Sequence, residues 1–351
     1  MTFDDGADLE AARVASDIIS KYGMKGTLML VAGSGSVQNN IDGWRELVAR
    51  GHLDVGAHGW AHMSPEGLSE QQIIQEIDGA MNYLRAQFPE ENVVTFATPF
   101  AKMTDAYMKR LKEYGVIANR LSAGDVIATS DLDKDLFTLA SPRMDKSFPP
   151  ANSQTAINSA VEGGKWFIEL YHSVRYSNES TDITPEMFEE HCKWLYDNYN
   201  GRVWFASYDD VAKYIAQYRA GTVEYTACDS ESMTFVARTD AYYGMDMTVK
   251  IFMPFFIDSA YAIINGEEIQ YLEVKKETNA RSVTLNIPMS EEGTEIKIVM
   301  GGNEKYANNC DHNYAVKELI ASTEDNFGYT EMICTICEHT YKSKYTDLIG
   351  E

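Results

Sequence analysis

The sequence predicts an α/β protein in which a parallel β/α unit precedes an all-β unit and a short tail rich in Cys and His. Three observations support this prediction. Helical and strand patterns alternate up to about residue 219, short alternating strands follow with almost no helix, and Cys and His cluster near the C-terminus. The chain has 351 residues, more than one typical domain. We therefore predict three domains, covering residues 1–219, 222–302 and 306–351.

Within the first unit, strand-like and helix-like segments follow one another. Helical spacing of apolar residues predicts helices at 8–22, 42–50, 69–88, 104–114, 153–162, 184–198 and 207–219. Short apolar runs predict about eight strands, at Phe3, 27–31, 53–57, 93–97, 115–119, 136–140, 166–171 and 203–206. Ser69, with Gln72 three residues on, is a capping-box N-cap for the third helix. Repeated β-then-α units imply parallel strands, closed into a barrel or opened into a doubly wound sheet, with the chemistry at the strand carboxyl ends.

The charge of the chain disfavours two classes of partner. Its 53 acidic residues outnumber its 30 Lys and Arg, so the formal net charge is −23. Nucleic acid and anionic membrane surfaces require clustered basic residues, so neither is expected as the main partner. The sequence also has no apolar stretch long enough to span a membrane. No signal segment is recognisable, and because the chain starts inside its first strand we expect an upstream segment to have been removed.

Acids and imidazoles occur at three predicted strand ends. The stretch "TFDDG" places Asp4 and Asp5 after the first strand, and "DVGAHGWAHMS" places His58 and His62 after another. Histidines four residues apart can bind one metal ion together, and a neighbouring aspartate can complete the ligand set. His172 ends the apolar run "FIELYH". This combination is typical of a hydrolytic metal centre on an α/β barrel.

Four motifs in order resemble one known family. The series "TFDDG", "GHLDVGAHGWAH", "FATPFA" and "LYH" is similar to the motif series of the polysaccharide deacetylases, also called the NodB-homology domain or carbohydrate esterase family four. The resemblance covers residues 1 to about 218. It implies a distorted (β/α) barrel of seven or eight strands and metal-dependent removal of acetyl groups from sugars. It also implies a secreted or cell-surface protein.

The resemblance assigns roles by motif position. It implies that Asp5, His58 and His62 bind the metal, with Zn²⁺ as first choice and Co²⁺ or Ni²⁺ as substitutes. Asp4 is the implied general base and His172 the implied general acid. The implied substrate-side residues are Leu170 at the acetyl-methyl pocket, Phe100 through its backbone N–H at the oxyanion, and Pro99 beside it. Trp60 either stacks on a sugar ring or packs in the core.

The sequence departs from the family pattern at several positions. Ala97 and Thr98 stand where the family more often has an arginine, which orients the base, and a proline. We predict that Arg143, after the strand at 136–140, reaches Asp4 in its place; an exposed structural arginine is the alternative. Asp145 is a weak candidate for the acid that tunes the catalytic histidine. Gly59 replaces the usual Ser or Thr after the first metal histidine.

The second unit and the tail carry separate predictions. The second unit, with strands such as "TVKIFMPFF" and "SVTLNIPM", predicts a β-sandwich that contacts carbohydrate or serves as scaffold. In the tail, Cys310 with His312 and Cys334 with Cys337 match the spacing of a tetrahedral zinc ribbon. A second, structural Zn²⁺ would supply folding free energy that the small core lacks. His339 could replace His312, and redox-active thiols are the minor alternative.

Two functions from different classes follow from these observations. The first is a deacetylase that acts on the N-acetyl groups of GlcNAc polymers such as peptidoglycan or chitin, or on the O-acetyl groups of xylan. Non-sugar amides are a smaller possibility. The alternative is a non-catalytic cell-surface glycan-binding protein with a decayed barrel, for which the missing motif arginine and the appended β and ribbon modules are the arguments.

Overall fold

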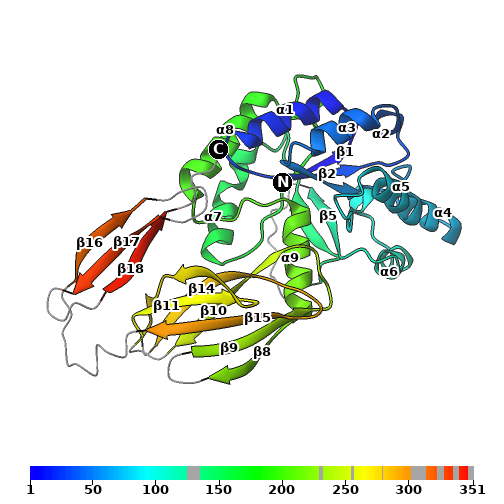
Figure 1. Ribbon diagram of the computed structural model, residues 1–351. Coiled ribbons are helices and arrows are strands. Elements are labelled where there is room, and N and C mark those ends of the chain that lie inside the picture. The colour runs from blue at the N-terminus through cyan, green and yellow to red at the C-terminus, as the bar shows by residue number, and fades with distance from the viewer. Residues whose placement is uncertain are drawn as a thin grey trace. The chain divides into compact units, whose positions relative to one another are not determined.

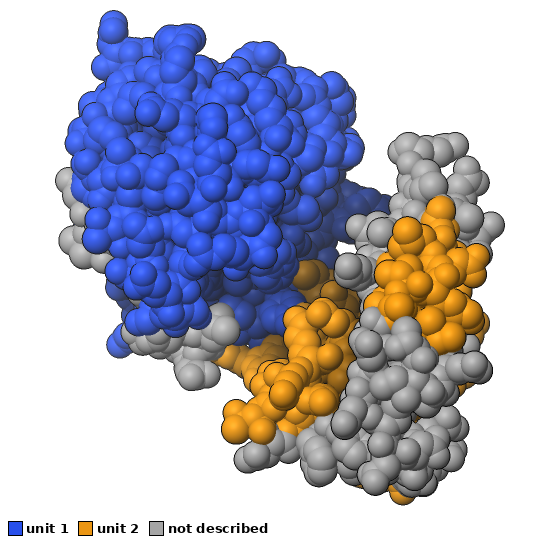
Figure 2. All heavy atoms as spheres, turned by 90° about the vertical axis from the view of Figure 1, so that its left-hand side faces the viewer, with its two compact units in different colours: residues 1–216 blue, residues 217–351 orange. Residues whose placement is uncertain are grey.

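The computed structural model describes residues 1–124, 135–228, 232–253, 257–278, 280–301, 314–321, 328–334 and 340–346. The chain forms two compact units, Met1–Ala216 and Gln217–Glu351, which Figure 2 shows in separate colours. Each unit is described by itself below. No helix among these residues has the length and apolar character needed to cross a membrane.

A seven-stranded sheet forms the centre of the first unit (Figure 1). Its strands are β1 (Thr2–Asp5), β2 (Gly26–Leu30), β3 (Leu53–Ala57), β4 (Thr95–Ala97), β5 (Ala118–Gly124), β6 (Leu139–Pro142) and β7 (Leu170–Tyr171). They lie in the order β6-β5-β4-β3-β2-β1-β7, and every neighbouring pair is parallel. This arrangement brings the carboxyl ends of all seven strands to one edge of the sheet.

The two outermost strands approach each other and close the sheet. A parallel bridge joins Arg143, the residue after β6, to Leu170 in β7. The backbone N–H of Met144 also donates to the Leu170 carbonyl oxygen at 2.7 Å. This contact between the end of β6 and β7, the barrel seam, is short because β7 has only two residues. The predicted distorted barrel is confirmed, with seven strands.

Helices lie between barrel strands, and α8 and α9 follow the last of these strands, β7. The helices are α1 (Leu9–Ser20), α2 (Gly35–Asn39), α3 (Ile41–Val48), α4 (Glu70–Ile74), α5 (Ala80–Gln87), α6 (Asp105–Glu113), α7 (Gln154–Glu162), α8 (Pro185–Tyr199) and α9 (Tyr208–Ala220), with the short η2 (Pro99–Ala101) and η3 (Pro150–Ser153). The helix predicted at 69–88 starts with the expected capping box of Ser69 and Gln72. A π-helical turn, η1 (Gln75–Gly79), lies between α4 and α5.

The strand predicted at 203–206 is wrong. Those residues follow α8 without strand pairing, and the N–H of Val203 bonds back to the Tyr199 carbonyl oxygen. Their apolar side chains instead line a cavity together with Met24 and Ile157. A short apolar run indicates burial, but burial against helices satisfies it as well as a sheet does.

The second unit is built from antiparallel strands. One sheet has the order β12-β11-β15-β9-β8 and another the order β10-β14-β13. The strands are β8 (Gly221–Cys228), β9 (Ser232–Thr239), β10 (Asp246–Met253), β11 (Ser259–Ile264), β12 (Glu267–Leu272), β13 (Lys275–Lys276), β14 (Arg281–Pro288) and β15 (Thr294–Gly301). Burial alternates along β14 and β15, so each sheet has one buried face, as the predicted sandwich requires.

The tail forms a third antiparallel sheet, ordered β16 (Tyr314–Ile320), β17 (Gly328–Cys334) and β18 (Thr340–Thr346). Three of the four predicted zinc ligands, Cys310, His312 and Cys337, lie outside the described residues, as does His339. Cys334 is the last residue of β17. The predicted zinc ribbon therefore stays a prediction.

Candidate active site

Three potential metal ligands converge at the carboxyl end of the sheet. Asp5 ends β1, His58 follows β3, and His62 lies four residues further on. Asp5 Oδ1 is 3.6 Å from His58 Nε2 and 3.4 Å from His62 Nε2. With metal–ligand bonds of ~2.0–2.2 Å, the ligand atoms of a tetrahedral site lie about 3.3–3.6 Å apart. The spacing of these atoms therefore fits one divalent ion with little rearrangement.

Two of these three side chains sit on unusual backbone. Asp5 has φ 75° and His62 has φ 57°, both in the left-handed region. Residues other than glycine reach this region at a cost of about 1–3 kcal/mol, and such residues concentrate at functional sites. The surrounding structure must therefore hold both ligands in place.

A hydrogen bond to the second ring nitrogen of His58 fixes the orientation and the tautomer of its imidazole. His58 is buried, and its Nδ1 lies 2.7 Å from the carbonyl oxygen of Ala97, which can only accept a hydrogen bond. Nδ1 therefore carries the proton, and Nε2 is left with a lone pair facing Asp5. Burial lowers the pKa of His58, which favours the neutral imidazole that a metal ion requires.

Asp4, the predicted base, is buried beside these ligands and paired with Arg120. The Nη2 of Arg120 donates to Asp4 Oδ1, and both side chains are buried. The other carboxylate oxygen, Oδ2, lies 3.7 Å from His58 Nε2. Burial by itself would raise the pKa of Asp4, but the charge of Arg120, followed by His58 and His172, lowers it below its usual value.

Arg120 corrects the prediction that Arg143 supplies this guanidinium. Arg143 Nε lies 2.6 Å from Asp145 Oδ2, at the barrel seam. Arg120 lies on β5 and pairs in register with Ala97, the position at which the family pattern has its arginine. The guanidinium thus comes from the neighbouring strand. In the sequence, the signal for this contact was that Arg120 directly follows the apolar run "GVIAN". The strand predicted at 115–119 stopped one residue short of it.

His172 follows β7 and shares a small cavity with Asp4. Its positive form is close enough to lower the pKa of Asp4. Its Nδ1 is buried and has no hydrogen-bond partner among the described residues. Asp145, the weak candidate for a partner, instead accepts from the backbone N–H groups of Ser147 and Phe148. Asp145 therefore stabilises its own loop.

The remaining predicted site residues differ in their surroundings. Phe100 has φ 55° and is 59% exposed, and its ring centroid lies 4.6 Å from that of His62. Pro99 is the buried first residue of η2, and Leu170 is buried in β7. The Trp60 ring packs edge-on against Tyr83, with centroids 5.9 Å apart. This packing favours the structural reading of Trp60 over sugar stacking.

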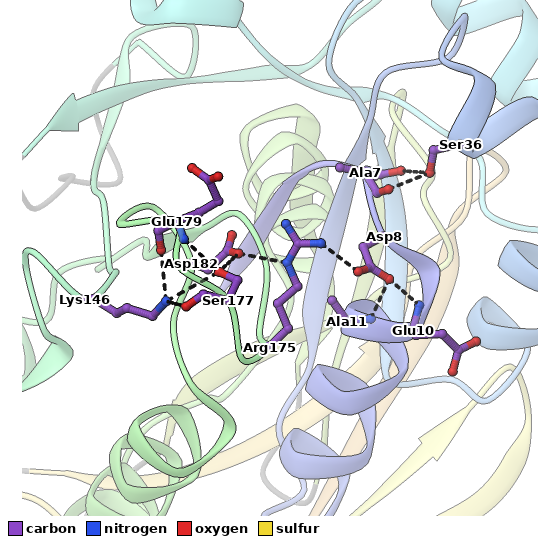
Figure 3. Close-up of polar contacts among 11 residues, drawn as sticks. Ala7, Asp8, Glu10, Ala11, Ser36, Lys146, Arg175, Ser177, Glu179 and Asp182 are labelled. Atoms are coloured by element: carbon purple, nitrogen blue, oxygen red, sulfur yellow. Dashed lines mark hydrogen bonds and ion pairs between the residues drawn. The ribbon is translucent and has the colours of Figure 1, made fainter.

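Figure 3 shows a polar network between the loops that follow β1 and β7. Arg175 lies between two carboxylates, donating from Nη1 to Asp8 at 2.9 Å and from Nε to Asp182 at 2.8 Å. Asp8 also caps α1 by accepting the N–H groups of Glu10 and Ala11. Asp4 and Asp5 precede Asp8, and His172 precedes Arg175. The network therefore links the loop after the two acids to the loop after the histidine, at the ends of the neighbouring strands β1 and β7.

The same network reaches the loop after β6. Lys146 Nζ donates to the carbonyl oxygens of Ser177 at 2.6 Å and Glu179 at 3.0 Å (Figure 3). The Lys146 N–H also donates to the Asp182 carbonyl oxygen. These contacts reinforce the barrel where the β6–β7 seam is short. Sequence patterns gave no signal for this network, because its members are separated along the chain.

Comparison with known proteins agrees with this geometry. Residues 1–118 match the family model for polysaccharide deacetylase. Among curated proteins, no match to the chain is found. The matched segment contains Asp4, Asp5, His58 and His62 and ends just before Arg120, so Arg120 and His172 lie beyond it.

Solved structures give weaker likenesses. Peptidoglycan deacetylase PdaC from Bacillus subtilis is 16% identical, with a TM-score of 0.40, and the alignment covers 60% of this chain and 89% of that one. A putative polysaccharide deacetylase from Mycobacterium smegmatis is 14% identical, with a TM-score of 0.45 and coverages of 58% and 76%. Deacetylase PplD from Streptococcus pyogenes is 18% identical, with a TM-score of 0.38 and coverages of 45% and 67%. All three scores are below 0.5, so the similarity to the polysaccharide deacetylase family rests on the sequence match over residues 1–118.

Proposed function

We propose that the protein is a metal-dependent hydrolase that removes acetyl groups from a polysaccharide. The observation that carries the proposal is the convergence of Asp5, His58 and His62. Asp4 lies beside them, outside this ligand set, and accepts a hydrogen bond from Arg120. Two imidazoles and a carboxylate suit Zn²⁺, and Co²⁺ or Ni²⁺ are plausible substitutes. When bound, the ion would lower the pKa of a coordinated water towards ~7 and polarise the acetyl carbonyl.

Asp4 is proposed as the general base. Arg120 occupies its Oδ1, which leaves Oδ2, on the His58 side, to take the proton from the attacking water. The low pKa of Asp4 keeps it ionised near neutral pH, as a base must be. Arg120 therefore acts as a positioning residue that both orients and ionises the base.

His172 is proposed as the general acid. When the carbonyl carbon–nitrogen or carbon–oxygen bond breaks, the leaving atom needs a proton, and a protonated His172 can donate it. Proton transfer of this kind contributes typically ~10²–10⁴-fold to the rate. The Phe100 backbone N–H is proposed to stabilise the carbonyl oxygen as it gains charge, with Leu170 lining the pocket for the acetyl methyl group.

We propose an acetylated polysaccharide outside the cell as the substrate, with the N-acetyl groups of GlcNAc polymers and the O-acetyl groups of xylan as the two classes to separate. One of the similar structures is a peptidoglycan deacetylase. We also propose domain boundaries at 219, 222, 302 and 306. The sandwich is proposed to contact glycan or to serve as scaffold, and the tail to hold a structural Zn²⁺.

The alternative of a non-catalytic glycan-binding protein loses one of its two arguments. That argument was the missing arginine next to the base, and Arg120 now fills this position from β5. The other argument, the appended β and tail units, does not separate a catalytic barrel from a decayed one.

Acetate release tests the proposal directly. The full chain is incubated with chitooligosaccharides, peptidoglycan and acetylated xylan, first as purified, then after chelation, then after Zn²⁺ is restored. We expect release from at least one substrate, its loss with the chelator and its recovery with the metal. Absence of release from all three at saturating Zn²⁺ would contradict the proposal and support glycan binding alone.

A further inference from the structure

Glu76 is a buried carboxylate that contacts the loop carrying His62. It lies in the π-helical turn η1 and is 1% exposed. Its Oε1 accepts the backbone N–H of Ala61 at 2.8 Å, and its Oε2 accepts the backbone N–H of Met63 at 3.2 Å. The two donors flank His62 on either side. One carboxylate thus bridges the backbone before and after a proposed metal ligand.

The glycine at position 59 makes room for this carboxylate. A Cβ built on Gly59 would lie 2.6 Å from Glu76 Oε2, closer than real side chains approach. Gly59 also has φ 84°, which side chains rarely adopt. The sequence resemblance predicts Ser or Thr here, and neither fits while Glu76 is in place. The lack of a side chain at Gly59 therefore allows the Glu76 carboxylate to occupy its position.

The rest of the loop packs on the same helical run. The Trp60 ring contacts Tyr83 of α5, and a Cβ on Gly79 would lie 3.5 Å from Trp60 Cε3. The π turn interrupts the α-helical ladder between α4 and α5, directly at Glu76. Such single turns lie inside α-helices and are frequent at functional sites. Here the turn contains the carboxylate that accepts from the loop.

We propose that Glu76 is a positioning residue for His62, with Gly59 as the residue that lets it approach. His62 has a left-handed backbone, φ 57°, which a histidine does not favour unless neighbouring contacts impose it. Charge-assisted hydrogen bonds from the adjacent N–H groups supply that constraint. The proposal rests on the proposed function only in that Asp5, His58 and His62 bind a divalent metal.

Metal affinity measured on the full chain tests the proposal. Zn²⁺ is titrated against a competing chelator, and Co²⁺ binding is followed by absorption. Thiolate charge-transfer bands report any Cys site, so they separate it from the nitrogen and oxygen site of the barrel. The His62→Ala variant supplies the background. Melting of the metal-free proteins checks that each variant folds.

Two matched pairs of variants isolate the role of Glu76. Glu76→Gln keeps the size but places an amide donor against one of the two N–H groups, whereas Glu70→Gln makes the same change on the exposed first turn of α4. Gly59→Ala pushes the carboxylate away, whereas Gly67→Ala makes the same change at φ 79° with nothing within 4 Å. We expect Glu76→Gln and Gly59→Ala to weaken barrel affinity by about 10–100-fold, and both controls to stay within about twofold of wild type.

The outcomes distinguish this proposal from the proposed function. Wild-type affinity in Glu76→Gln, together with equal affinities in Gly59→Ala and Gly67→Ala, overturns the role of Glu76 and leaves the metal site standing. Absence of metal in the wild-type barrel overturns both. If Glu76→Gln does not fold, the glycine pair decides, because Gly59→Ala moves the carboxylate without removing it.

Discussion

Replacing Arg120 tests the most specific contact in the site. Arg120 and Asp4 are both almost fully buried, and Arg120 Nη1 also lies 3.4 Å from Ser141 Oγ. Arg120→Leu removes one partner of a buried ion pair and leaves the Asp4 carboxylate with only histidines nearby. Loss of one partner in such a pair typically costs about 3–5 kcal/mol, because the remaining charge stays desolvated.

A double-mutant cycle separates the cost of leaving the Asp4 charge unpaired from the free energy of the Arg120–Asp4 contact. We expect Arg120→Leu to lower the free energy of unfolding by about 3–5 kcal/mol, measured by urea denaturation, and to abolish acetate release. Adding Asp4→Asn removes the orphaned charge, so the double variant should recover much of the stability but none of the activity. Arg143→Leu is the control: its side chain is 33% exposed and its partner Asp145 also accepts the backbone N–H groups of Ser147 and Phe148, so the expected loss is smaller than for Arg120→Leu.

The reasoning would be refuted if Arg120→Leu and Arg143→Leu lowered stability and turnover equally. It would also fail if Asp4→Asn gave no recovery in the Arg120→Leu background. In either case Arg120 would not be the residue that holds the base.

Three further predictions follow from the same structure. Asp4→Asn keeps the metal ligands, so metal content by elemental analysis should match wild type while turnover falls by at least about 10²-fold; retained turnover would remove Asp4 as the base. Arg175→Ala cuts the link between the β1 and β7 loops, so kcat should fall while barrel metal affinity is unchanged, and Arg13→Ala, which breaks an exposed pair, should alter neither. Burial raises the pKa of Glu91 to about 7 and that of Asp209 to about 6. Between the usual pKa of these carboxyls and the raised values, the folded protein holds protons that the unfolded chain has released. The free energy of unfolding should therefore fall as pH rises from the usual carboxyl pKa to about 7. Glu91→Gln should flatten this slope in denaturation series across pH, and an unchanged slope would contradict the assignment.

Much of the candidate metal site could be predicted because its signals are local. Asp4 and Asp5 are adjacent, His58 and His62 are four residues apart, and each pair follows an apolar run that could be recognised as a strand. In parallel sheets the carboxyl ends of strands meet at one edge, so strand ends alone placed these residues together. The capping box at Ser69 was equally local and is confirmed.

Other features could not be read from local patterns. The run at 203–206 was apolar enough for a strand, yet its burial comes from a cavity lined by helices and loops. The π turn at Glu76 leaves helical periodicity almost unchanged, so the sequence predicted one helix at 69–88 without marking the residue that accepts from the His62 loop.

By itself, the sequence predicted candidate metal ligands, because spacing along the chain decides which side chains share a strand end or a loop. The roles of base and acid were implied by its resemblance to a family. Only the tertiary structure decided which arginine contacts Asp4 and which carboxylate supports His62. Those contacts join residues 116 and 15 or 13 positions apart along the chain. They depend on strand register and on how deeply each side chain is buried. Arg120 reaches the base because β5 lies in register beside β4, and a buried charge remains only where a partner meets it.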